Sequence, residues 1–171
     1  MVIKNIVKRI IGIYDFDREA ERLIKKSIKI YKKGGLINKI RARRLQNIIQ
    51  RNFNCSFPPF IDVGENIYIA HPQGISIGRT AIIGDNCRIY PGAGIVAAIK
   101  GDNERYINKQ RRHAKIGNNC ILGYGCTLIG SITIGDNVVI GARAIVTKDI
   151  PSNSLVKNVN EIKPLKRDDF F

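Results

Sequence analysis

Residues 116–140 read IGNNCILGYGCTLIGSITIGDNVVI, and their aliphatic residues recur every six positions. One five-residue phrase occurs three times in the chain, as IGDNC at 83–87, IGNNC at 116–120 and IGDNV at 134–138. A short fixed period is typical of a solenoid, in which each coil of the chain stacks on the coil before it. The stretch therefore predicts a repeat fold.

Each six-residue unit begins with an aliphatic residue and carries a small or aliphatic residue at its fifth position. The first positions are Ile77, Ile83, Ile89, Ile95, Ile116, Leu122, Leu128, Ile134, Ile140 and Val146. The fifth positions are Ala81, Cys87, Ala93, Cys120, Cys126, Ile132, Val138 and Ala144. The Gly, Asn and Asp residues between them tolerate the left-handed backbone conformations that tight corners require. The pattern predicts a triangular solenoid of short parallel strands, three units to a coil.

The spacing also locates an insertion. Ile116 and Ile134 are 18 residues apart, which is one coil, but Ile83 and Ile116 are 33 apart. The surplus falls on residues 98–112, AIKGDNERYINKQRR, which are polar and basic enough to form a loop outside the prism. We expect this loop, which ends at His113, to favour an anionic ligand.

Residues 1–55 have a different composition, with 15 Lys and Arg against 4 Asp and Glu, whereas residues 56–171 have 14 against 10. Their apolar residues recur at helical spacing, Asp17 is a candidate N-cap, and Gly34-Gly35 is expected to end a helix. We predict a basic amphipathic helical region at 1–55 and a β-helix domain at 56–171 that ends in a short C-terminal tail. The basic faces are interpreted as solvated surface, or as a weak attachment to anionic membranes or an acidic partner. No nucleic-acid motif or aromatic stacking platform accompanies them.

Several classes of protein are not predicted. The four cysteines, Cys55, Cys87, Cys120 and Cys126, form no CxxC pair and are interpreted as core residues in a reducing compartment. No apolar run is long enough for a transmembrane helix, and the N-terminus lacks a signal-peptide pattern. A soluble cytoplasmic protein without a metal site is expected.

Residues 57–150 resemble the hexapeptide-repeat acyltransferases, and within them the serine acetyltransferase branch with its relatives from bacterial surface-polysaccharide gene sets. The resemblance is carried by VGENIYIAHP (63–72), GISIG (74–78), RHAKIG (112–117), IGA (140–142) and VTKDIP (146–151). It implies a left-handed parallel β-helix, a homotrimer with active sites between subunits, and transfer of an acetyl group from acetyl-CoA to a hydroxyl.

The same resemblance implies roles for particular residues. His71 stands at the place of the general base, a role suited to imidazole because it titrates near neutral pH. His113 stands where the family contacts the acceptor, and Arg112 where it meets a substrate carboxylate. The coenzyme would contact Gly123, Tyr124, Gly141, Ala142, Thr147 and Lys148.

The sequence departs from the family in three places. The aspartate that orients the catalytic histidine falls on Ser56, the acidic residue before that histidine falls on Ala70, and a Gly-x-Pro-Ala turn is replaced at residues 158–161. The lost carboxylates favour an O-acetyltransferase acting on a sugar of a surface polysaccharide or its precursor. A serine O-acetyltransferase of cysteine biosynthesis and a catalytically silent trimeric scaffold stay open. The zinc-dependent relatives need three histidines, and this chain has two.

Overall fold

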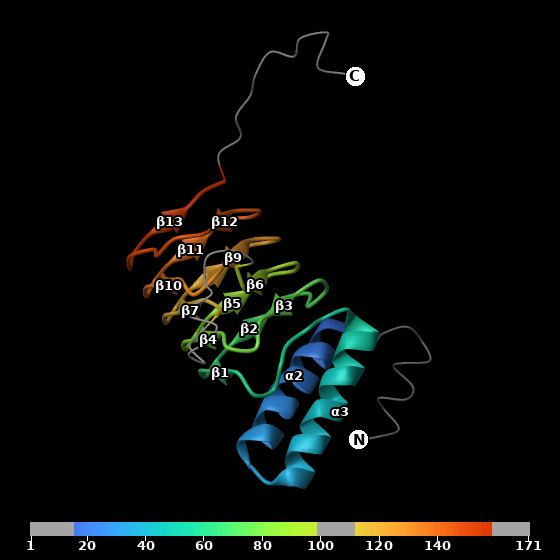
Figure 1. Ribbon diagram of the computed structural model, residues 1–171. Helices are drawn as coiled ribbons and strands as arrows, with labels where there is room; N and C mark the ends of the chain where they lie inside the picture. Colours follow the sequence, from blue (N-terminus) through green and yellow to red (C-terminus); the bar gives the residue numbers. More distant parts are fainter. Residues whose placement is uncertain (1–15, 99–111, 159–171) are drawn as a thin grey trace.

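The computed structural model describes residues 16–98 and 112–158, which form a helical hairpin followed by a three-sided solenoid (Figure 1). The hairpin consists of α2 (Phe16–Lys32) and α3 (Leu36–Phe53). The strands are β1 (Asp62–Val63), β2 (Tyr68–Ile69), β3 (Ser76–Ile77), β4 (Ile82–Ile83), β5 (Arg88–Ile89), β6 (Gly94–Val96), β7 (Lys115–Ile116), β8 (Ile121–Leu122), β9 (Thr127–Ile129), β10 (Thr133–Ile134), β11 (Val139–Ile140), β12 (Ile145–Val146) and β13 (Leu155–Val156).

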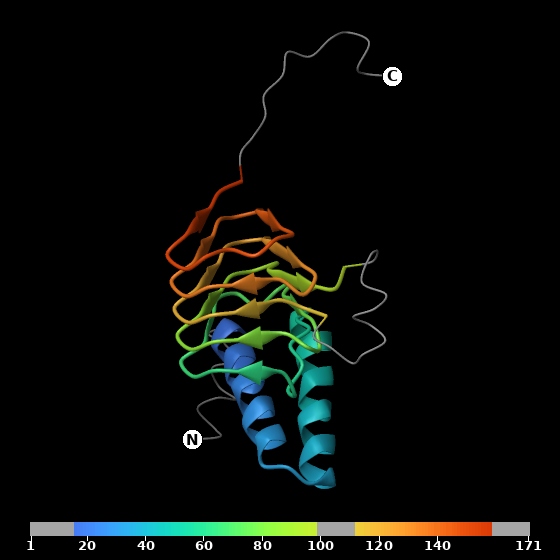
Figure 2. The same cartoon turned by 60° about the vertical axis from the view of Figure 1, so that its left-hand side comes forward.

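The strands form three parallel sheets, one on each side of the prism. Their orders are β1-β4-β7-β10, β13-β11-β8-β5-β2 and β12-β9-β6-β3. Each strand therefore pairs with the strand three places later in the chain, one coil away, except that β11 pairs with β13. Figure 2 shows the coils stacked on one another above the two helices. The register places Ile83 beside Ile116 and Ile89 beside Leu122. The six-residue period therefore produces the predicted parallel β-helix.

The repeated IGDN phrase forms one column of corners. The asparagines of this column adopt left-handed φ angles of 55° to 60°, a conformation that asparagine tolerates better than most residues. In the first four of them the amide Nδ2 donates to the Oδ1 of the asparagine one coil further along, at 3.0 to 3.2 Å. The column is Asn66, Asn86, Asn119, Asn137 and Asn153. The sequence repeat thus provides a side-chain ladder that locks successive coils in register.

The predicted inward positions form the core. All the first and fifth positions that the period assigns are buried, and the four cysteines are free thiols within the core. Burial raises the pKa of Cys55 and of Cys126 to about 12, which agrees with unreactive core thiols. The β-helix extends beyond Ile150, because β13 adds a further strand beside β11.

The helical hairpin closes the N-terminal end of the prism. Helix α2 buries Ala20 and Ile24 and α3 buries Ile49 and Phe53, all as part of the same core as the coils. Gly34 and Gly35 separate the helices with φ angles of 72° and 78°, as the sequence predicted. The interpretation of Asp17 as an N-cap is wrong, because this residue lies inside the first turn of α2.

Three parts of the sequence predictions fall outside the described residues: the helical region before residue 16, most of the loop at 98–112, and the C-terminal tail beyond residue 158. Within the described ranges, no helix is both long and apolar enough to cross a membrane.

Candidate functional site

His71 lies at a corner of the prism between β2 and β3. This corner is two residues longer than a regular one, because Ile69 and Ile77 are eight positions apart where the period is six. His71 itself has a φ of 41°, which is uncommon for a residue other than glycine. Its side chain is 68% exposed. The longer corner therefore holds the imidazole at the rim of the prism, open to a ligand.

Asp17 contacts His71 from the N-terminal turn of α2. The carboxylate Oδ2 of Asp17 faces Nδ1 of His71 as an ion pair or hydrogen bond. In the neutral imidazole the proton consequently lies on Nδ1, where it is donated to the carboxylate, and Nε2 has a free lone pair. Nε2 is then the atom that can accept a proton.

His113 lies at a different corner, between the sheet of β3 and the sheet of β4. Its Nδ1 lies 2.8 Å from Oγ1 of Thr80 and 3.4 Å from the Thr80 backbone N–H. Oγ1 of Thr80 also accepts the backbone N–H of Arg112 at 2.9 Å, so its own proton is available for His113. The hydroxyl and the backbone N–H of Thr80 thus both point their protons at Nδ1. The proton of neutral His113 therefore lies on Nε2.

Two features fix the ring of His113 and its charge. A Cβ on Gly78 would collide with the ring, so glycine at this position makes room for it. Burial, and after it the positive charge of Arg112, lowers the pKa of His113 below its ordinary value. His113 is therefore neutral near pH 7 and presents an N–H donor, whereas His71 presents an acceptor.

The residues expected to contact the coenzyme divide between the same two corners. Gly123, Tyr124, Gly141 and Ala142 continue the column of corners that contains His71, here called the His71 edge. Thr147 and Lys148 lie on the column that contains Arg112 and His113, here called the His113 edge.

The two glycines of the His71 edge have a structural role of their own. A Cβ on Gly123 would lie 2.6 Å from the carbonyl oxygen of Ile140, and one on Gly141 would lie 2.8 Å from that of Val156. Tyr124 is exposed, with the guanidinium of Arg143 5.7 Å from its ring centroid. Close packing of the coils therefore accounts for these glycines without a ligand.

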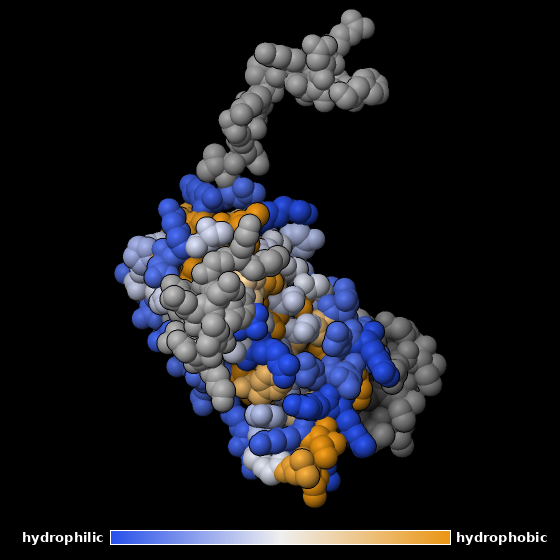
Figure 3. All heavy atoms as spheres, viewed as in Figure 1, coloured by the Kyte–Doolittle hydropathy of each residue, from blue (hydrophilic) through white to orange (hydrophobic). Residues whose placement is uncertain are grey.

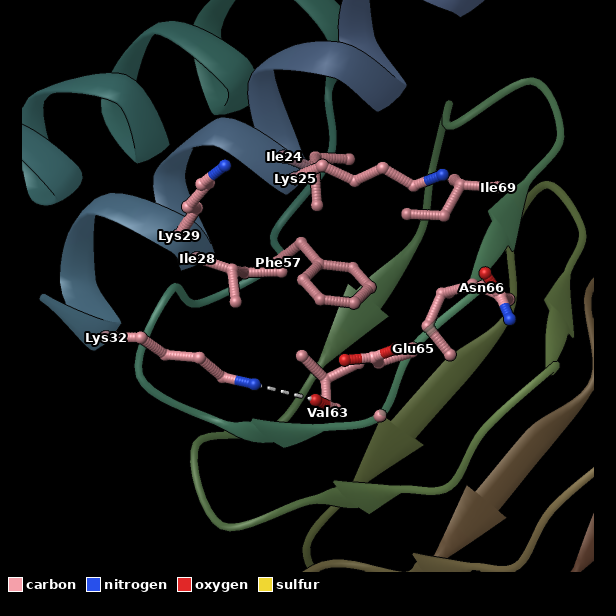
Figure 4. Close-up of a pocket in the computed structure, with 12 residues that line it drawn as sticks. Ile24, Lys25, Ile28, Lys29, Lys32, Phe57, Val63, Glu65, Asn66 and Ile69 are labelled. Carbon is pink, nitrogen blue, oxygen red and sulfur yellow. Dashed lines mark hydrogen bonds between the residues drawn. The ribbon is translucent and has the colours of Figure 1, made fainter.

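The predicted site residues are not brought together within one chain. His71 begins one edge of the prism and His113 lies on another, with the sheet of β3 between them. The larger of the two described cavities, about 420 Å³ between α2 and the first coil, is lined by none of them (Figure 4). In that cavity Nζ of Lys32 donates to the carbonyl of Val63 at 3.1 Å. No group of three metal-binding side chains occurs in the described ranges.

Comparison with known proteins places this geometry in a family. The family described as "Bacterial transferase hexapeptide (six repeats)" matches residues 113–148. A serine acetyltransferase of Helicobacter pylori is 34% identical over 113 residues, which are 66% of this chain and 62% of that protein. A crystal structure of serine acetyltransferase from Neisseria gonorrhoeae in complex with serine has a TM-score of 0.68 and 28% identity, covering 85% of this chain and 56% of that one. This chain belongs to the serine acetyltransferase family of hexapeptide-repeat transferases.

Other serine acetyltransferases are similar to it at comparable levels. That of Synechococcus elongatus is 38% identical over 101 residues, 59% of this chain and 38% of that protein. The structure of the Brucella abortus enzyme in complex with coenzyme A has a TM-score of 0.71 and 26% identity, covering 86% of this chain and 55% of that one. The chain thus spans 38% and 62% of the length of the two curated relatives described here.

The sequence does not predict the two residues that contact the histidines of the candidate site, Asp17 and Thr80. The sequence around Asp17 indicates only the start of a helix, and no residue near it in the sequence indicates a contact with His71. Thr80 lies in a repeat corner without any motif of its own. Both act through contacts between distant parts of the chain, which only the packing of α2 and the stacking of coils create.

Proposed function

We propose that this protein is an acetyl-CoA-dependent O-acetyltransferase with His71 as its general base. The observation that carries the proposal is the contact between Asp17 and Nδ1 of His71. A carboxylate on Nδ1 directs the lone pair of Nε2 outward and stabilises the imidazolium that forms during proton transfer. The sequence has lost the family carboxylate at Ser56, and Asp17 takes over its role from a different element.

The proposed reaction is one acyl transfer. Acetyl-CoA supplies the acetyl group as a thioester. His71 Nε2 takes the proton of the acceptor hydroxyl as the oxygen attacks the carbonyl carbon; a C–O bond forms, the C–S bond breaks, and the proton passes to the leaving thiolate. The neutral His113 donates its Nε2–H to the acceptor and positions it. Arg112 contributes positive charge beside it.

A homotrimer completes this site. The two edges carry complementary halves: a base with Gly123, Tyr124, Gly141 and Ala142 on one, and a donor with Arg112, Thr147 and Lys148 on the other. A cyclic trimer places the His71 edge of one chain against the His113 edge of the next, three times over. Lys148 then lies where it can attract the phosphates of the coenzyme.

L-Serine is the first candidate acceptor, because the relatives described above are serine acetyltransferases and one is a complex with serine. Arg112 suits the serine carboxylate. A sugar hydroxyl is the second candidate. Ala70, which is buried and uncharged beside His71, offers no carboxylate to the amino group of serine. None of these relatives has a name that refers to polysaccharide. The proposal of a sugar acceptor therefore rests on Ala70 and Ser56.

We place the enzyme in the cytoplasm, with weak attachment to anionic membrane surfaces through its basic hairpin. The exposed apolar residues at the start of α3 support this attachment, since Leu36 is 75% and Ile37 67% exposed.

The test is release of thiol from acetyl-CoA in the presence of serine, homoserine, amino sugars or nucleotide sugars. We expect one acceptor class to give release that is lost in His71→Ala, with a kcat lower by about 10² to 10⁴ and an unchanged KM for acetyl-CoA. Turnover by His71→Ala at the wild-type rate would contradict the assignment of the base. Absence of release with every acceptor would favour the silent scaffold.

A further inference from the structure

A second cavity, of about 320 Å³, lies between α3 and the start of the His113 edge. Its lining is Arg43, Gln46, Ser56, Pro58, Phe60, Ile77 and Arg79. Arg43 and Gln46 come from one face of α3, whereas Arg79 belongs to the corner that follows β3. The same corner holds Gly78 and Thr80, which contact His113. The cavity therefore adjoins the proposed site without including its catalytic residues.

The charge of this cavity is unbalanced. Among the described residues, no Asp or Glu lines it, and neither Arg43 nor Arg79 forms an ion pair. The only recorded partner of the Arg79 guanidinium in those ranges is the ring of Phe60, 5.1 Å from the ring centroid. A ring face leaves the N–H groups at the edge of the guanidinium available. Two positive charges thus share one polar cavity with a hydroxyl and an amide as further donors.

We propose that this cavity binds a phosphate group. A phosphate carries close to two negative charges at neutral pH and three strong acceptor oxygens, which matches two guanidiniums. A carboxylate would neutralise only one of them. Ser56 keeps the cavity positively charged, because it is an uncharged residue beside the two arginines. The phosphate is one on the acetyl acceptor or one on the coenzyme; assigning it to either rests on the proposed function, whereas its binding does not.

Equilibrium dialysis of the full chain against radiolabelled inorganic phosphate, at constant ionic strength, tests the proposal. We expect saturable binding of one phosphate per chain. Arg43→Gln and Arg79→Gln should each weaken it by about 10- to 100-fold, the loss expected for a charged hydrogen bond. Ser56→Asp should weaken it similarly by placing a carboxylate in the cavity. Arg41→Gln is the matched control, since it removes the same charge from α3 outside the cavity, and should change the affinity less than about twofold.

The outcomes separate cleanly. Absence of saturable binding, or equal weakening by Arg41→Gln, overturns the proposal, because the second result would mean a general attraction to a basic surface. Displacement of bound phosphate by acetyl-CoA supports the site and assigns it to the coenzyme, and displacement by a sugar phosphate but not by acetyl-CoA assigns it to the acceptor. Dialysis measures binding without turnover, so failure of the proposed acetyl transfer and failure of this site are read independently.

Discussion

The carboxylate of Asp17 faces Nδ1 of His71, joining the first turn of α2 to the longest corner of the first coil. The helix that closes the end of the prism thereby also orients the proposed base. A residue that acts in this way positions the catalytic group and does not itself touch the substrate. Removing the carboxylate of Asp17 should therefore lower kcat.

Asp17→Asn should lower kcat by about 10- to 100-fold while leaving the KM for acetyl-CoA unchanged, because the imidazole loses the carboxylate that orients it and stabilises its protonated form. The measurement is steady-state acetyl transfer to the acceptor identified by the panel. Asp17→Glu should recover part of the rate. Glu21→Gln is the control, because Glu21 lies on the same helix and pairs only with Lys25 among the described ion pairs. A full rate in Asp17→Asn would show that His71 needs no carboxylate.

Gly78→Ala should lower the rate of acetyl transfer, because the new methyl group would occupy the space of the His113 ring and displace its Nε2–H. Gly94→Ala is a matched substitution one coil away, where the nearest atom to the new Cβ would lie at 3.7 Å, an ordinary contact. Comparing kcat and the unfolding midpoint of the two variants separates displacement of the His113 ring from a general loss of stability. Equal losses of activity would mean that the substitution acts through the coil and not through His113.

The titration of His113 should depend on Arg112. Burial and Arg112 lower the pKa of His113, so the folded chain binds fewer protons there than the unfolded chain just below the ordinary histidine value of about 6.5. The free energy of unfolding consequently falls as the pH drops through that value toward the folded-state pKa. Arg112→Gln removes the smaller of the two causes and should move the pKa of His113 upward.

Because the chain has two histidines, only two imidazole signals need to be assigned, and an NMR titration then follows that of His113. Arg88→Gln, on an exposed strand position of another sheet, should leave the titration of His113 unchanged. If the pKa of His113 stays the same in Arg112→Gln, Arg112 does not contribute to lowering it.

Complementation between chains should reveal the shared site. His71→Ala and His113→Ala should each be inactive alone, but refolding an equal mixture should restore activity. If each site takes His71 from one chain and His113 from the next, random mixing leaves about one quarter of the sites intact. Light scattering should report a trimer in both variants. A mixture as inactive as its components would indicate that each chain carries its own complete site, or none.

The hairpin should bind anionic vesicles at low salt. Leu36→Ser combined with Ile37→Ser should reduce co-sedimentation with vesicles rich in phosphatidylglycerol by at least about tenfold, because two inserted aliphatic side chains are lost. Figure 3 shows apolar surface at the tip of the hairpin, with hydrophilic surface next to it on the face drawn. Leu155→Ser, which changes another exposed leucine near the other end of the prism, is the control. Identical recovery of all three proteins in the supernatant would reject membrane attachment.

The sequence by itself determined the β-helix. A period of six assigns an inward aliphatic residue to every strand, and the recurring Asn supplies the left-handed corner, so each coil specifies its own path from local residues. The core cysteines, the break at Gly34 and the positions of His71 and His113 on corners follow from the same local rules.

Only the tertiary structure decided what surrounds those histidines. The tautomer of His71 is fixed by Asp17, and that of His113 by Thr80. Neither partner lies near its histidine in sequence. Helix α2 docks on the open end of the prism because its apolar face must be buried, and this docking, which no local period encodes, brings a carboxylate to one imidazole. Stacking of one coil on the next brings a hydroxyl to the other, so the two neutral imidazoles carry their protons on different ring nitrogens.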